Sequence, residues 1–112
     1  MSTGFENREE GHEAKIKHDA DVIFRIHARR DKLLGQWAAE RMGLEADAID
    51  EYAIELVKHD IKEPGDEDVI EKLTADFKAR GVEMDEEAIR QKLAEYEAIA
   101  TDQVQGEGYK QE

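Results

Sequence analysis

Cysteine is absent from this 112-residue chain, so disulfide bonds, thiolate catalysis and cysteine-ligated zinc are all excluded. Ser2 is the only serine, which argues against a serine hydrolase. Long apolar runs are also missing, since no window approaches the roughly 18–20 uncharged apolar residues of a membrane-spanning helix. We therefore expect no membrane insertion, and the polar N-terminus lacks the apolar region of a signal peptide. These absences are compatible with a protein of the reducing cytoplasm.

Acidic side chains dominate the composition: 29 acidic and 16 basic residues give a formal net charge of −13. Because phosphate binding needs a cationic surface, this balance argues against nucleic acid as a partner. The excess lies entirely in residues 43–112, whereas residues 1–42 hold eight acidic and eight basic side chains. The basic residues of the first third either pair with acidic neighbours in the same fold, which is the simpler interpretation, or face a partner.

Glycine and proline interrupt the chain at Gly43, Pro64-Gly65 and Gly81, and the segments between them have helical length and periodicity. We expect Gly43 to end the first helix and Asp47 to cap the second. Because each segment has one apolar stripe and the connections are short, we predict an all-α fold, a four-helix bundle. The helices are expected over about residues 19–42, 47–62, 66–80 and 85–104.

The apolar stripes supply the candidate core, and the aromatic side chains on them are interpreted as core residues. Arg30 also falls on the first stripe. Because a buried, unpaired guanidinium would be costly, we expect Arg30 to reach past the edge of the stripe to an acidic partner. The expected core side chains are Ile23, Ile26, Leu33, Leu34, Trp37, Ala38, Ile49, Tyr52, Ala53, Leu56, Val57, Ile61, Val69, Ile70, Leu73, Phe77, Ile89, Leu93, Tyr96, Ile99, Ala100 and Val104.

Residues 1–18 combine helical register with little apolar surface. Thr3 and Glu6 fit a capping box, while Phe5 and Ile16 are the only large apolar side chains after the initiator methionine. We predict a mobile, helix-prone arm that becomes ordered on a partner; an ordinary frayed terminus is the alternative. The predicted divisions are residues 1–18 (arm), 19–105 (bundle) and 106–112 (frayed tail).

Motifs for catalysis and ligand binding are missing from the sequence. The four histidines form no HExxH motif and no pair with a carboxylate at ligand spacing, so no metal site is expected. Asp66-Glu67-Asp68 lacks the calcium-loop pattern and fits a helix N-terminus instead. Glycine-rich phosphate loops are absent, and nothing places two carboxylates in one cleft. We therefore predict that the protein has no catalytic residues.

Two segments resemble the ζ-subunit family of alphaproteobacterial F-type ATP synthases. They are HEAKIKHDADVIFRIHARRDKLLGQWAAERMG at residues 12–43 and EPGDEDVIEKLTADF at residues 63–77. Members of this family inhibit the ATP synthase. The resemblance implies a four-helix bundle with a mobile N-terminal region that is not an enzyme and acts peripherally to the inner membrane. Ile16, where many members have an aromatic residue, and Asp21, where glutamate is usual, depart from the pattern.

The resemblance also implies a mechanism. The N-terminal region would enter the interface between the α and β subunits of the catalytic sector, near the γ subunit of the rotor. There it would act as a helical wedge that blocks ATP hydrolysis. The chain is expected to be a monomer when free. The residues onto which the family's inhibitory region maps include Phe5, Arg8, Glu9, Glu13, Lys15, Ile16 and Asp19.

Weak binding of ATP or ADP is a further property that the resemblance associates with the bundle. It supports an alternative function, in which the chain is an adenine-nucleotide-binding regulatory module without inhibitory activity. The arginines of the first helix would then bind the nucleotide, but their spacing indicates no particular site.

Overall fold

The computed structural model describes the backbone of residues 2–107 and the side chains of residues 20–106. It contains four helices: α1 (Ser2–Arg41), α2 (Ala46–Lys62), α3 (Asp66–Ala79) and α4 (Glu86–Glu107). Strands are absent from the part of the chain that the model describes. The prediction of an all-α, four-helix fold is confirmed, and the last three helices begin and end within three residues of their expected bounds.

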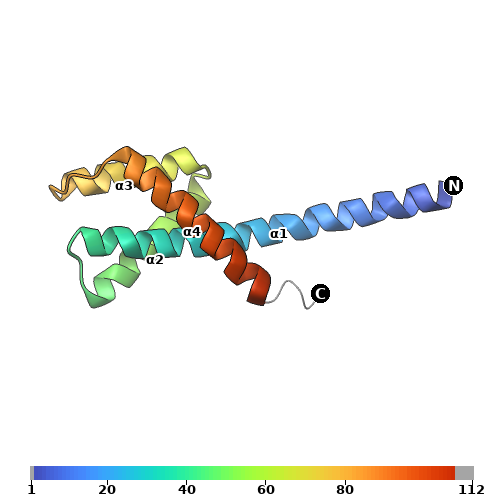
Figure 1. Ribbon diagram of the computed structural model, residues 1–112, viewed down its shortest axis with the longest axis horizontal. Coiled ribbons are helices and arrows are strands. Elements are labelled where there is room, and N and C mark those ends of the chain that lie inside the picture. The colour runs from blue at the N-terminus through green and yellow to red at the C-terminus, as the bar shows by residue number, and fades with distance from the viewer. Residues whose placement is uncertain (1, 108–112) are drawn as a thin grey trace.

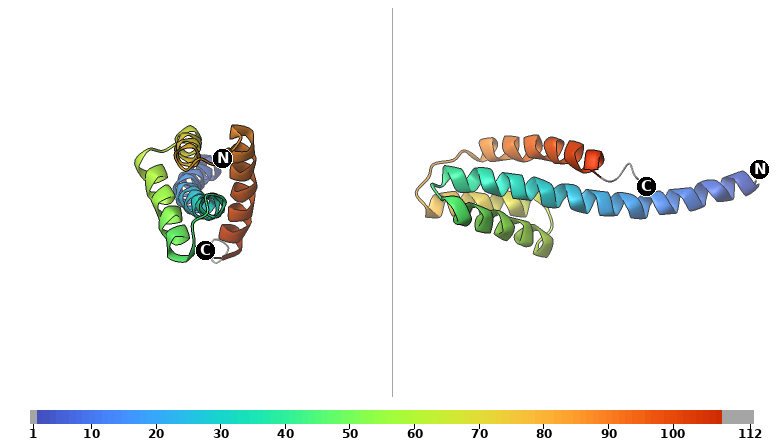
Figure 2. Two further views of the ribbon diagram at one scale, coloured as in Figure 1. Left: turned by 90° about the vertical axis from the view of Figure 1, so that its left-hand side faces the viewer. Right: turned by 90° about the horizontal axis from the view of Figure 1, so that it is seen from below.

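The long helix α1 is the axis of the molecule. Its 40 residues span about 60 Å at 1.5 Å per residue, close to the 64 Å length of the whole protein. The other three helices surround only its C-terminal half, so its N-terminal half projects beyond the bundle (Figure 1). Seen along its length, α1 lies between α2 and α4, its two main contacts, with α3 beside them (Figure 2).

Two glycines end helices as their sequence positions predict. Gly43 has a φ of +86°, its N–H donates to the carbonyl of Glu40, and Leu44 N–H donates to Ala39. Gly81 repeats this arrangement after α3 with a φ of +72°. Both are Schellman caps, which need a left-handed residue that glycine adopts without a Cβ clash.

The predicted cap of α2 is wrong. Glu45, not Asp47, occupies the N-cap position, with extended backbone (φ −130°, ψ 152°) and no side-chain capping bond. Asp47 lies inside the first turn, where its charge still favours the positive end of the helix dipole. Asp85 does cap α4, because its Oδ1 accepts a 3.3 Å hydrogen bond from the N–H of Glu87.

The main hydrophobic core joins all four helices. Leu34 of α1, Leu56 of α2 and Ile89 of α4 are fully buried. Phe77 of α3 packs edge-on against Trp37, with ring centroids 5.8 Å apart. The stripes read from the sequence therefore meet as expected in this part of the bundle.

A second, smaller cluster lies where α1 leaves the bundle. Val22 and Ile26 of α1 pack there against Ala100 and Val104 of α4. Ile23, predicted as a core residue, is 51% exposed. The reason is that only α4 contributes to this cluster, so the buried face of α1 is narrower here than the sequence stripe.

Two other core predictions are wrong. The side chain of Ile61, in the last turn of α2, is 54% exposed. Ile99 of α4 is 37% exposed because its neighbour Ala100 is the residue that packs in the smaller cluster. The apolar stripe that the sequence predicts on each helix is therefore wider than the face that the neighbouring helices cover.

Close packing of α1 and α2 depends on Gly35. A Cβ added at Gly35 would lie 2.7 Å from the Cα of Ala53, far inside contact distance. The two helices therefore approach each other at a distance that only glycine permits. Gly35 belongs to the segment on which the family resemblance rests.

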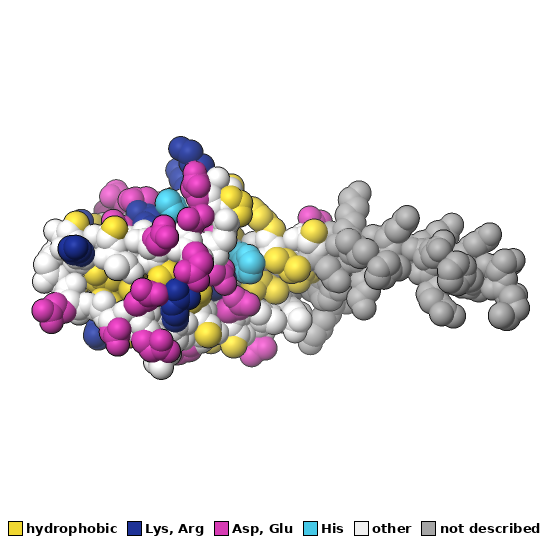
Figure 3. All heavy atoms as spheres, turned by 90° about the horizontal axis from the view of Figure 1, so that it is seen from above, with side chains coloured by type: hydrophobic (Ala, Val, Ile, Leu, Met, Phe, Trp, Pro, Cys, Tyr) yellow, Lys and Arg dark blue, Asp and Glu magenta, His cyan; other side chains and the backbone are white. Residues whose placement is uncertain are grey.

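Acidic side chains are spread over the described face of the bundle in Figure 3, with few basic ones among them. This agrees with the excess of negative charge in residues 43–112. Within the described range, no helix is long and apolar enough to cross a membrane.

Candidate functional site

Arg30 is the centre of a buried ionic cluster that contains a residue from every helix. Its Nε donates to Oδ1 of the adjacent Asp31 at 2.9 Å, and Nη2 donates to Oδ2 of Asp60 on α2 at 3.2 Å. Nη1 donates to Oδ1 of Asp66 at the start of α3 and to Oε1 of Glu97 on α4, both at 3.0 Å. The side chain of Arg30 is 0% exposed. Arg30 therefore pairs with acidic side chains as expected, but it does so inside the bundle and does not reach past the edge of the apolar stripe.

One cation cannot neutralise four carboxylates. Asp66 and Glu97 are about half exposed and keep contact with water, whereas Asp31 is 1% and Asp60 10% exposed. Burial raises the pKa of Asp31 and its hydrogen bond with Asp60 raises it further, to about 8, although the charge of Arg30 opposes the shift. At neutral pH the carboxyl group of Asp31 therefore keeps its proton.

The same cluster keeps Arg30 charged. Burial alone would lower the pKa of its guanidinium, but the charge and hydrogen bond of Asp31, with those of Asp66 and Glu97, raise it above its ordinary value. A permanently charged residue is thus held by hydrogen bonds to all three other helices. This fixes the position of α1 in the bundle.

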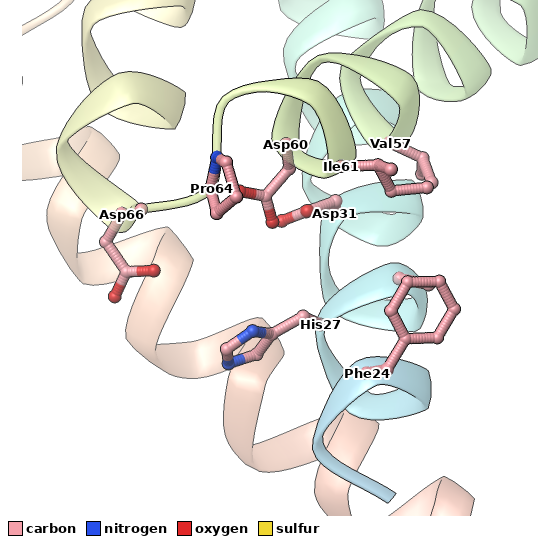
Figure 4. A pocket seen from close by; sticks show the side chains of 10 residues that line it. Phe24, His27, Asp31, Val57, Asp60, Ile61, Pro64 and Asp66 are labelled. Carbon is pink, nitrogen blue, oxygen red and sulfur yellow. The ribbon is translucent and has the colours of Figure 1, made fainter. Parts of the chain in front are cut away.

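A cleft between α1 and α2 opens directly above the cluster. Its volume is about 270 Å³, and Figure 4 shows the carboxylates of Asp31 and Asp60 pointing toward each other at its floor. Phe24 and Ile61 stand at its side. The lining residues are Phe24, His27, Ala28, Asp31, Val57, Asp60, Ile61, Pro64, Gly65 and Asp66. The cleft combines apolar walls with an acidic floor.

The residues predicted to bind the ATP synthase lie outside the residues whose side chains are described. For this part of the chain the structure gives only the backbone of helix α1. The residues in question are Phe5, Arg8, Glu9, Glu13, Lys15, Ile16 and Asp19.

The arginines of α1 differ in their access to a ligand. Arg30 has no exposed surface, so it cannot bind a nucleotide phosphate. Arg29 donates to Oε1 of Gln103 at 3.1 Å on the exposed side of α4. Nucleotide binding near these arginines stays a prediction. No metal-binding group of three or more histidine or acidic side chains occurs among the side chains that the structure describes.

Sequence reasoning missed the composition of the cluster. The position of Arg30 on an apolar stripe was a usable signal, because it predicted a buried cation with an acidic partner. Asp60, Asp66 and Glu97 gave no such signal in a chain with 29 acidic residues. Asp66 was interpreted only as a helix N-terminal acid, a position that it does occupy.

The chain matches one known protein family and is similar to solved structures. The family model described as "ATPase inhibitor subunit zeta" matches residues 1–103 of this chain. A solution NMR structure is similar, with a TM-score of 0.65 and 38% sequence identity over 75% of this chain and 95% of that chain. No curated protein matches. Because the family model covers nearly the whole sequence, the chain belongs to the ATPase inhibitor subunit zeta family.

Proposed function

We propose that this protein inhibits ATP hydrolysis by the F-type ATP synthase, using residues 1–18 as a wedge between the α and β subunits of the catalytic sector. Family membership supports an inhibitor subunit that interacts with the ATP synthase. The observation that carries the mechanism is the projection of α1 beyond the bundle (Figure 1). About 25 Å of helix precedes residue 19, enough to enter an interface between subunits and approach the γ subunit of the rotor.

The bundle supplies the base of the wedge. Because Arg30 binds carboxylates from α2, α3 and α4, a force on the N-terminal half of α1 is transmitted to the whole bundle. An inhibitor that stops a rotor by steric obstruction needs such a fixed base. This is a regulatory role without chemistry of its own, in keeping with a sequence that offers no catalytic motif.

In the proposed complex, the enzyme supplies the apolar contact that residues 1–18 lack, since Phe5 and Ile16 are their only large apolar side chains after Met1. Ordering some 15 residues costs about 1–2 kcal/mol each, which requires on the order of 600–1,200 Å² of buried apolar surface to balance. A deep cleft between two subunits provides contact of this size. The proposed contact residues are those named in the sequence: Phe5, Arg8, Glu9, Glu13, Lys15, Ile16 and Asp19.

Titration of the purified chain into the cognate ATP synthase catalytic sector, with ATP hydrolysis as the readout, tests the proposal. The full chain should abolish most hydrolysis, and a variant lacking residues 1–18 should have no effect at any concentration. A variant lacking residues 108–112 is the matched control and should inhibit like the full chain. An inactive full chain, or inhibition that survives removal of residues 1–18, would show that the proposed function is wrong.

A further inference from the structure

Two large hydrophobic side chains are exposed at the same cleft. Phe24 of α1 is 56% exposed and Ile61 of α2 is 54% exposed, and both line the cleft above the Arg30 cluster (Figure 4). Ile23, beside Phe24 in sequence, is 51% exposed. Single exposed hydrophobic residues are ordinary, but two that line the same cleft indicate a contact surface.

The cleft lies next to the arm along the same helix. Phe24 follows residue 18 by six positions, which is about 9 Å along an α-helix. Since α1 runs without a break from Ser2 to Arg41, a helix inserted up to residue 18 brings Phe24 to the mouth of the site that it enters. In Figure 3, hydrophobic side chains gather where the bundle borders the grey residues. The surface nearest the cleft in the inhibited complex is therefore that of the catalytic sector.

The negative charge of the cleft favours a cation as its occupant. The protonated Asp31 and the carboxylate of Asp60 line its floor and Asp66 lines its edge. Arg30 is the only cation that the described contacts give to Asp60, Asp66 and Glu97. Of the other titratable groups nearby, His27 lines the cleft and Glu97 adds another negative charge from α4. A positive group from outside would relieve this excess of negative charge.

The size of the cleft favours one long side chain. A volume of about 270 Å³ lies near the lower end of the roughly 300–1,000 Å³ of small-molecule sites and is ample for one extended side chain. Lysine and arginine fit both its walls and its floor, because each has an apolar stem and a charged end. The apolar stem would lie against Phe24 and Ile61 while the charge approaches Asp60.

We infer that the cleft between α1 and α2 is a second docking site, which binds a lysine or arginine side chain on the surface of the catalytic sector beside the entry of the arm. This inference rests on the proposed function. The wedge obstructs the rotor, and the cleft adds affinity by holding the bundle against the enzyme. Linking two contacts on one rigid helix raises the local concentration of each at its partner.

The contribution of the apolar side chains of the cleft is tested with matched isoleucine variants of α2. Ile61→Ala removes a side chain of the cleft, whereas Ile54→Ala removes one that is 49% exposed and lies outside it. In titrations of ATP hydrolysis with the full chain, Ile61→Ala and Phe24→Ala should each raise the half-inhibitory concentration roughly tenfold. Ile54→Ala should change it less than about twofold, and maximal inhibition should stay unchanged in all three because the arm is intact.

The contribution of the negative charge of the cleft is tested with matched aspartate variants. Asp60→Asn removes a negative charge from the floor of the cleft, and Asp50→Asn removes one from an exposed position of the same helix. Both variants lower the net negative charge by one, so general attraction to the enzyme changes equally. Only Asp60→Asn should weaken inhibition and make the half-inhibitory concentration less sensitive to salt.

Each result has a distinct meaning. If the unaltered chain does not inhibit, the proposed function itself is wrong. If it does inhibit and the cleft variants match their controls, the second docking site is wrong and the wedge stands. Weakening by Ile61→Ala without weakening by Asp60→Asn would show that the occupant is not cationic and would also overturn the inference. Circular dichroism and thermal unfolding of every variant exclude loss of the fold as the cause.

Discussion

Two arginines in this bundle make nearly the same bonds in opposite surroundings. Arg90 of α4 binds Glu67 of α3 through both Nη atoms, each at 2.9 Å, and its Nη2 lies 2.8 Å from Glu86. Arg30 binds four carboxylates with similar distances. The side chain of Arg90 is 38% exposed, whereas that of Arg30 is completely buried. The two clusters therefore separate the effect of burial from the effect of the number of bonds.

Solvent explains the difference. If a partner of Arg90 is lost, water hydrates the remaining charges, so exposed pairs contribute little to stability. Around Arg30 water can hydrate Asp66 and Glu97 but reaches Asp60 poorly, so loss of the guanidinium would leave the charge of Asp60 largely uncompensated. The two clusters also join different parts of the molecule. Arg90 connects α3 with α4, and Arg30 connects both of them and α2 to the helix that carries the arm.

The largest effect is expected from Arg30→Met. It keeps the apolar stem but removes the only guanidinium of the buried cluster, so Asp60 loses its counter-charge and Asp31 loses its hydrogen-bond donor. We expect the free energy of unfolding to fall by about 3 kcal/mol, the lower end of the range for a broken buried ion pair, because Asp66 and Glu97 can still reach water. Urea denaturation followed by circular dichroism measures it. A loss below about 1 kcal/mol would show that burial does not distinguish the two arginines.

The raised pKa of Asp31 gives a second prediction, which concerns the pH dependence of stability. Asp31 has a pKa of about 8 in the folded chain, well above the ordinary value of 3.8, so the folded state keeps a proton that the unfolded chain has released. This contribution to stability is complete below about pH 4, falls by about 1.4 kcal/mol per pH unit, and is lost above about pH 8.

Asp31→Asn isolates this contribution because an amide cannot ionise and still offers an N–H to Asp60. The unfolding free energy of the variant, minus that of the natural chain, should rise with pH by about 1.4 kcal/mol per unit between pH 6 and 8 and level off above 8. Exposed Asp50→Asn serves as the control, and its difference should not depend on pH in this range. A flat difference for Asp31→Asn would mean that Asp31 is ionised in the fold.

The contrast between the two arginines also shows what the sequence could predict. Helix bounds and most of the core follow from glycine, proline and apolar spacing, because these act locally. Arg30 could be predicted to be paired, since its position on an apolar stripe required it. Which carboxylates pair with it depends on how α2, α3 and α4 cross α1, and that is set by packing such as the contact of Gly35 with Ala53. The cleft also depends on how these helices cross, so no local sequence pattern predicts it.

The smallest effect is expected from Arg90→Met. The substitution removes four hydrogen bonds, the same number that Arg30 makes, yet the side chains of Arg90, Glu67 and Glu86 are all exposed to water. We expect the urea midpoint to stay within experimental error of that of the natural chain. Any residual difference should disappear at 1 M NaCl, where the Debye length is about 3 Å. In Arg30→Met the same salt should restore little of the lost stability, because Asp31 and Asp60 are only 1% and 10% exposed. If Arg90→Met were as unstable as Arg30→Met, bond number and not burial would decide the strength of these clusters.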